Sequence, residues 1–312
     1  MDSFEFESGR VLENVNVEYS VSGIPKYDDD GNMVNVVIYC PTLKGDYSIL
    51  PKYHDFISND SFDKNDFFFI NIISLGAPES CSPSVTGLKY NFPQYTFKDR
   101  VNFKKQFLAE KFNIETVYCL VGEGLGGFEV LTWACEYPDD MEFILILNST
   151  FKTSGYRYVL LKCAESIIDS TDDFYSEVYS TSLSRAVVAI TQLMFVSYLS
   201  RDVFEKLNND EIDVLIDDYV DEGLFMDIYD FKSRNDCISQ YDVGDKLCNI
   251  KAKSLILGVD GYLNFNLKEY EQMKDSIENS KMAIFRFNES YYESADYNDL
   301  GIEIISFLKQ LK

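Results

Sequence analysis

The sequence is poor in the side chains that build metal and disulfide sites. Of its 312 residues only His54 is a histidine, and the seven cysteines include no C-x-x-C pair. An odd number of cysteines without such spacing fits reduced thiols better than a disulfide framework. One histidine and scattered cysteines do not make a zinc site. We therefore expect no bound metal and a reducing, cytoplasmic environment.

Basic residues are scarce as well. The chain has 28 Lys and Arg against 52 Asp and Glu, a formal net charge of −24. A balance of this sign disfavours binding to nucleic acids and to anionic membrane surfaces. The longest apolar stretches, such as 67–73, are far shorter than the roughly 18 residues of a membrane helix. The first residues also lack the basic and apolar regions of a signal peptide. We expect neither a membrane nor a nucleic acid as a partner.

A glycine-dense turn organises the rest of the chain. Residues 116–121 are rich in β-branched and aromatic side chains, which predicts a buried strand. The glycines of 122–127 follow, and then a helical pattern that ends at Tyr137-Pro138. Strand, tight turn and helix form the nucleophile elbow G-x-S-x-G, which holds a serine at the end of a sheet. Here the serine position falls on Gly124, which has no side chain to react.

The surrounding pattern predicts an α/β protein with a mostly parallel sheet and helices on both faces. We divide it into a first core part, 1–150, a helical insert, 151–240, and a last core part, 241–312. The insert is expected to form a lid or a dimerisation module. The expected strands are an opening hairpin within 1–30, followed by a turn at 28–31, then 34–39, 67–73, 116–121, 142–147, 252–259 and 282–287. The expected helices are 96–112, 128–136, 158–168, 183–207, 212–219 and 298–311. The first is expected to begin with a capping box, because Asp99 follows Thr96 by three residues.

Several motifs, in the same order along the chain, resemble one known family. The run 121–133 is similar to V-G-G-S-M-G-G-M-Q-A-L-E-W, the loop 40–45 to C-H-A-L-T-G, and 96–99 to T-I-R-D. Segments 183–186 and 241–243 are similar to the lid helices and to the return to the sheet. On these motifs the chain resembles the homoserine O-acetyltransferase family, of the α/β-hydrolase fold. The resemblance covers nearly the whole length.

The resemblance implies ping-pong acyl transfer from acetyl-CoA to homoserine by a serine, a histidine and an aspartate. The serine position is Gly124. The aspartate and histidine segments of the family align with 258–266 and 289–295, which places Tyr262 and Ser294 at the two partner positions. Loss of the serine of such a triad costs roughly 10⁶-fold in rate. We therefore expect no catalytic residue of the family triad to be retained.

Other groups near the expected pocket were weighed as replacements. The backbone amides of Leu43 and Leu125 are expected to form the oxyanion hole, whatever their side chains. His54 is the only histidine that could serve as a base, although a surface or half-buried position without a role in catalysis is the simpler explanation. Cys40 lies beside the oxyanion loop, where packing is the simpler explanation, and its nearest basic residue in sequence is Lys44.

Two carboxylates also lie near the expected site. Asp260 comes two residues before the aspartate position and Glu123 directly before Gly124. Acid–base chemistry would need both groups to converge on one substrate atom. The alternative is that each is solvated or paired in a salt bridge.

Three hypotheses for function follow. The first is a catalytically silent homologue that binds a ligand or a partner, as a homodimer through the lid helices or as a heteromer with an active paralogue. The second is an enzyme, such as a hydrolase, with altered chemistry in the same pocket. The third is the family's own activity in methionine biosynthesis. No cofactor is expected, and acetyl-CoA enters as a substrate only if the family activity survives.

Overall fold

The computed structural model describes residues 1–41, 65–176, 180–197, 199–223, 226–261, 263–264 and 266–286. In these ranges the chain forms a mixed sheet of seven strands with the spatial order β3-β5-β4-β6-β7-β8-β9. All neighbouring strands are parallel except β3, which pairs antiparallel with β5. The α/β-hydrolase fold predicted from the sequence is confirmed. The strands are β3 (Tyr19–Gly23), β4 (Val36–Cys40), β5 (Phe68–Ile72), β6 (Val117–Glu123), β7 (Met141–Leu147), β8 (Lys253–Asp260) and β9 (Ser280–Arg286).

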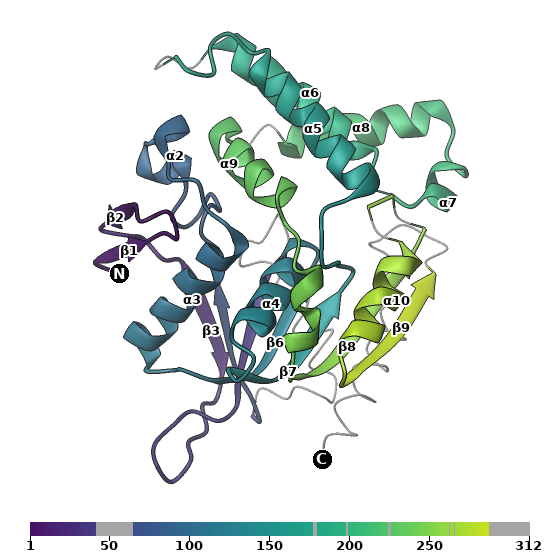
Figure 1. Ribbon diagram of the computed structural model, residues 1–312. Helices are drawn as coiled ribbons and strands as arrows, with labels where there is room; N and C mark the ends of the chain where they lie inside the picture. The colour runs from purple at the N-terminus through teal and green to yellow at the C-terminus, as the bar shows by residue number, and fades with distance from the viewer. Residues whose placement is uncertain are drawn as a thin grey trace.

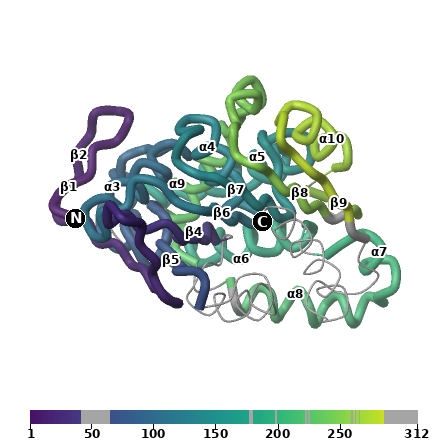
Figure 2. The backbone as a smooth tube through the Cα atoms, turned by 90° about the horizontal axis from the view of Figure 1, so that it is seen from below, coloured from purple at the N-terminus to yellow at the C-terminus, as the bar shows by residue number. Residues whose placement is uncertain are grey.

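The central strands are buried along almost their whole length. Every residue of β4 and β5 is buried, as expected for parallel strands that are covered on both faces. Three helices cover one face of the sheet: α3 (Phe97–Phe112), α4 (Leu125–Glu136) and α10 (Leu267–Ser276) (Figures 1 and 2). α3 begins with the predicted capping box, in which Thr96 and Asp99 each accept a hydrogen bond from the other's backbone N–H.

In the described part of the chain between β7 and β8, five α-helices cover the carboxyl end of the sheet (Figure 1). They are α5 (Gly155–Asp169), α6 (Thr181–Phe195), α7 (Arg201–Phe204), α8 (Asn209–Gly223) and α9 (Ile228–Ser239). The expected single helix 183–207 is wrong. α6 ends in a turn at Val196, and the extended backbone of Ser200 starts α7 as a new helix. α9 and α10 were not predicted, because their apolar positions are interrupted by charged residues that prove to be buried, such as Asp230 and Glu269.

The N-terminal region differs from the expected hairpin over 1–30. The hairpin is shorter: β1 (Ser3–Glu5) pairs with β2 (Val11–Glu13), and Gly9 lies in the connecting turn. The turn predicted at 28–31 exists, but it closes an isolated bridge between Tyr27 and Met33. β3 leaves this region and joins the main sheet. It is an edge strand beside β5 and not the second half of a hairpin.

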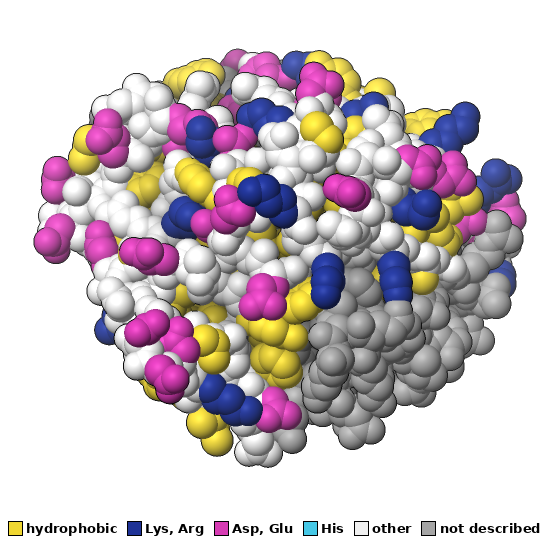
Figure 3. Space-filling model, turned by 60° about the horizontal axis from the view of Figure 1, so that its bottom comes forward, with side chains coloured by type: hydrophobic (Ala, Val, Ile, Leu, Met, Phe, Trp, Pro, Cys, Tyr) yellow, Lys and Arg dark blue, Asp and Glu magenta, His cyan; other side chains and the backbone are white. Residues whose placement is uncertain are grey.

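Short elements complete the described chain: α2 (Pro83–Thr86) and the 3₁₀ helices η1 (Lys89–Asn91) and η2 (Gly244–Asn249). The expected final helix 298–311 lies outside the described residues. None of the helices in the described ranges is long and apolar enough to cross a membrane. On the face shown in Figure 3, acidic side chains are interspersed with Lys and Arg and do not form a single field of charge.

Candidate functional site

The elbow predicted from the sequence is present in the backbone. β6 ends at Glu123, α4 begins at Leu125, and Gly124 between them has φ 53° and ψ −116°. A positive φ of this kind is strained for residues with a side chain and natural for glycine. The N–H of Gly124 donates to the carbonyl of Leu147 at 3.0 Å, and the hydroxyl of Ser149 donates to the carbonyl of Gly124 at 2.7 Å. Gly124 is therefore the fixed apex of the turn.

The glycines around the apex allow the close packing of the elbow. A Cβ on Gly126 would lie 1.8 Å from the carbonyl oxygen of Cys40, and one on Gly122 would lie 2.4 Å from the carbonyl oxygen of Gly126. A Cβ on Gly127 would lie 2.3 Å from the hydroxyl of Ser149. The start of α4 thus rests directly on the end of β4, with no room for a methyl group. The spacing of the glycines reflects contact between backbones.

The N-terminus of α4 is one half of the predicted oxyanion hole. Leu125 is the first residue of the helix, where backbone N–H groups have no acceptor within the helix and attract negative charge. The other half, Leu43, lies outside the described residues, and so do His54, Tyr262 and Ser294. The oxyanion hole and the replacement of the aspartate and histidine remain predictions.

Cys40 is placed at the end of β4 and is completely buried. Lys104 of α3, which was not considered from the sequence, lies next to it, with its Nζ 3.4 Å from the sulfur. Lys44 lies outside the described residues. Burial raises the pKa of the Cys40 thiol to about 11, and the nearby lysine only partly offsets this effect. A protonated, enclosed thiol is a poor nucleophile. The packing explanation for Cys40 is therefore the one that fits the structure.

An unexpected buried ion cluster lies behind Cys40. Glu129 of α4 is fully enclosed and lies 2.6 Å from Nη2 of Arg100 and 2.6 Å from Nζ of Lys104. The Ser74 hydroxyl also donates to it, at 2.7 Å. Burial opposes the charged form of Glu129, but the two cations outweigh burial and lower the pKa of its carboxyl group. The i,i+4 spacing of Arg100 and Lys104 predicts that both side chains lie on one face of the helix, but it does not show that this face is buried.

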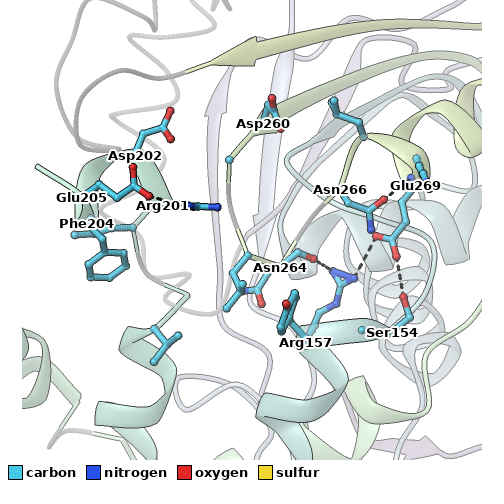
Figure 4. A pocket seen from close by; sticks show the side chains of 18 residues that line it. Ser154, Arg157, Arg201, Asp202, Phe204, Glu205, Asp260, Asn264, Asn266 and Glu269 are labelled. Carbon is cyan, nitrogen blue, oxygen red and sulfur yellow. Dashed lines mark hydrogen bonds and ion pairs between the residues drawn. The ribbon is translucent and has the colours of Figure 1, made fainter.

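Asp260 lines a cavity of about 1120 Å³ at the carboxyl end of β8 (Figure 4). The walls come from the start of α5, from α7, and from the loop and helix that follow β8. Asp202 of α7 and Glu205, the residue directly after it, bring further carboxylates, and Arg201 is paired with Glu205 at 2.8 Å. Glu123 is buried and, among the described residues, is not part of this lining. The structure therefore does not bring the two predicted carboxylates together in this cavity.

A buried network joins this cavity to the lid. Glu269 of α10 accepts hydrogen bonds from Thr150 at 2.9 Å, from Ser154 at 2.8 Å and from Arg157 at 3.4 Å. Arg157 also donates to the carbonyl of Asn264 at 2.7 Å (Figure 4). These bonds fix the first turn of α5 against the loop after β8. Within the described ranges no group of three or more His, Cys, Asp or Glu side chains could hold a metal ion.

The comparisons with known proteins agree with this architecture. No profile of a known protein family matches the chain. It is 38% identical over 260 residues to a probable acyltransferase of Methanothermobacter thermautotrophicus. This match covers 83% of this chain and 80% of that protein. It is 28% identical over 222 residues to a homoserine O-acetyltransferase of Methanohalophilus mahii, but this match spans only 44% of that protein and 64% of the chain.

Solved structures show the same fold at low sequence identity. An acetylester hydrolase from Corynebacterium glutamicum has a TM-score of 0.84 at 16% identity, over 98% of this chain and 94% of that one. A homoserine O-acetyltransferase from Bacillus anthracis has a TM-score of 0.80 at 16% identity, over 99% and 95% of the two chains. The match to the Methanothermobacter protein shows that the chain belongs to the homoserine O-acetyltransferase-like acyltransferase family, and the solved structures show the α/β-hydrolase fold.

Proposed function

We propose that this chain binds an acyl donor, such as acetyl-CoA, at the elbow without forming an acyl-enzyme at residue 124. The observation that carries the proposal is the glycine at the apex of an intact elbow. The turn is present and packs closely on β4. The N-terminus of α4 follows directly and would face an acyl carbonyl. The atom that would attack the carbonyl is absent. On this proposal the protein is a catalytically silent homologue that works by binding a ligand or a partner.

A second candidate is an acyltransferase of the homoserine O-acetyltransferase type. The names of the sequence relatives favour it, including the archaeal relative that matches most of the chain. Such an activity would have to use another nucleophile, or transfer the acyl group directly from the thioester to the acceptor. In serine proteases that lack a triad member, the oxyanion hole and substrate binding together retain roughly 10³–10⁴-fold acceleration over water. The second candidate therefore predicts turnover that does not involve residue 124.

The N–H of Leu125 allows a direct test of donor binding. Proline is tolerated at the first position of a helix, so Leu125→Pro removes this N–H and keeps α4. Leu125→Ala is the matched control, because it removes the side chain and keeps the N–H. We expect calorimetry to show acetyl-CoA binding to the wild-type protein and to Leu125→Ala. Leu125→Pro should bind about fivefold more weakly, the worth of one neutral hydrogen bond.

Thermal melting of the two variants controls for damage to the elbow. If they melt alike and bind acetyl-CoA alike, the amide does not contact the donor and the proposed binding mode is wrong. If the wild-type protein does not bind acetyl-CoA at all, donor binding itself is refuted.

A further inference from the structure

The lid, residues 155–239, packs largely on itself. One apolar cluster within it joins α5, α6 and α9, and a second joins the end of α6 to α7 and α8. Among the described buried residues of the lid, only Leu161, Cys237 and Ile238 belong to the large cluster of the core, and all three lie near one of the two ends of the lid. The lid is therefore a separate packing unit. Such units move relative to their neighbours unless a large apolar interface joins them.

The lid is attached to the core through a narrow neck. The chain enters the lid along 151–153 and leaves it along 241–243. These two segments run antiparallel and share backbone hydrogen bonds of 2.8 and 2.9 Å. Hinges between packed units consist of a few such residues at the ends of helices and strands. The neck is thus a single place about which the lid can rotate.

Arg157, in the first turn of α5, ties the lid to three parts of the core beside this neck. It donates to the carbonyl of Asn264, in the loop after β8, at 2.7 Å and to Glu269 of α10 at 3.4 Å. The Cζ atom of its guanidinium also lies 5.7 Å from the ring centroid of Phe128 in the elbow helix α4. Glu269 in turn accepts a hydrogen bond at 2.8 Å from Ser154, which directly precedes α5 (Figure 4).

These ties cross a seam between lid and core that contains the cavity of about 1120 Å³. Arg157 and Arg201 line the cavity from the lid, and Gly261 and Glu269 line it from the core. The N–H of Arg201 donates to the carbonyl of Gly261 at 3.1 Å across the seam. On this side of the neck, polar contacts around a cavity therefore join the lid to the core.

The charges in the seam are only partly compensated. Arg157 and Glu269 are 7% and 6% exposed. Burial lowers the pKa of Arg157, and the negative charge of Glu269 offsets this effect only in part. The removal of two charges from water can cost as much free energy as their attraction returns. Because opening of the seam would return both groups to water, only a small difference in free energy favours the closed position.

We propose that the lid rotates about its neck and that Arg157 and Glu269 form the latch that holds it closed over the cavity. Release of the latch would move the start of α5 and α7 away from α10 and from the loop after β8, and would widen the cavity. The opposite side of the lid remains tied, because Asp230 of α9 accepts hydrogen bonds from Ser82 and Ser84 at the start of α2 (Figure 1). This device does not depend on the proposed binding of an acyl donor at the elbow.

Amide hydrogen exchange, followed residue by residue with mass spectrometry, tests the latch because it detects rare openings. The reporter is the N–H of Arg201, whose hydrogen bond to Gly261 crosses the seam. The main variant is Glu269→Gln, which keeps the shape of the side chain and removes its charge. We expect the N–H of Arg201 to exchange at least about tenfold faster in this variant, the worth of one charged hydrogen bond.

The N–H of Thr153, which is bonded within the neck, distinguishes rotation of the lid from unfolding. It should be better protected than the N–H of Arg201 in both proteins, because the neck stays closed while the seam opens. The matched control variant is Glu271→Gln, which removes an exposed carboxylate from the same helix. It should leave the exchange of Arg201 unchanged.

If Glu269→Gln does not fold, Ser154→Ala provides a milder test. It removes one neutral donor to Glu269, and the Ser154 hydroxyl makes no capping bond to α5 that would be lost as well. The N–H of Arg201 should then exchange about fivefold faster. The proposal is overturned if Arg201 exchanges at the wild-type rate in the folded variants. It is also overturned if Arg201 and Thr153 are equally protected, because the seam then opens only when the neck unfolds.

Discussion

The buried ion cluster at Glu129 gives the sharpest prediction about stability. Glu129→Gln keeps the shape of the side chain but leaves Arg100 and Lys104 enclosed without a counter-charge. Removal of one partner from a buried pair typically costs about 3–5 kcal/mol. Because whole domains have a free energy of unfolding of about 5–15 kcal/mol, this loss would be a large share of the total. Urea denaturation of the two proteins, followed by circular dichroism, measures the difference.

A second substitution tests whether the loss of stability comes from the uncompensated positive charge. Lys104→Met removes one of the two cations, so the double variant with Glu129→Gln carries less uncompensated charge than Glu129→Gln alone. We expect the double variant to be more stable than the sum of the two single effects predicts, by about 1 kcal/mol or more. A loss below about 1 kcal/mol in Glu129→Gln, or strict additivity in the cycle, would refute the view that this cluster is held together by its charges.

The same carboxylate predicts a pH dependence. The pKa of Glu129 is lower in the folded protein than in the unfolded chain, because Arg100 and Lys104 outweigh the effect of burial. Its contribution to stability is therefore fully present above the unfolded pKa and is lost as the pH falls through the folded pKa. Glu129→Gln should lose less stability than the wild-type protein between neutral and acidic pH. Equal losses in the two proteins would contradict this assignment.

Three further predictions concern the elbow and its surroundings. Gly126→Ala forces a Cβ against the Cys40 carbonyl and should cost about 3 kcal/mol or more, whereas Gly9→Ala, at a positive φ but in open space, should cost about 1–2 kcal/mol in the same urea assay. Cys40 should resist alkylation by iodoacetamide in the folded protein while the exposed Cys163 reacts, as peptide mass spectrometry will show. Gly124→Ser should give no esterase turnover on p-nitrophenyl acetate, because the sequence predicts neither a base nor an orienting carboxylate for it. Turnover in that variant would show that the partner positions were misplaced.

The parts of the fold that were predicted share a local cause. Val36–Cys40 is a continuous apolar strand and Phe68–Ile72 is interrupted only by Asn71, and the Thr96 capping box is a signal that lies within four residues. The elbow was visible because its glycines are required by backbone contacts that recur wherever this turn is built. Such features depend on short stretches of chain and can be read without knowledge of the partner segments.

The parts that were missed depend on partners distant in sequence. Asp230 and Glu269 made the sequences of α9 and α10 appear too polar for buried helices. Serines within 70–155 donate hydrogen bonds to these carboxylates, but they are too distant in the sequence to be foreseen. Arg100 pairs with Glu129, twenty-nine positions along the chain, on a neighbouring helix. Lys104 was missed as a basic neighbour of Cys40 for the same reason, because it reaches the thiol only after α3 packs on the sheet.

The central claim is that a donor binds at the elbow and no acyl-enzyme forms at residue 124. The most direct measurement incubates the protein at high concentration with acetyl-CoA, with and without homoserine, and follows free CoA together with the intact mass of the protein. We predict CoA release at the rate of a control without protein, and no acetyl adduct. Homoserine-dependent release of CoA together with a stoichiometric acetyl adduct would contradict the claim, and the position of the adduct would identify the nucleophile that the protein uses.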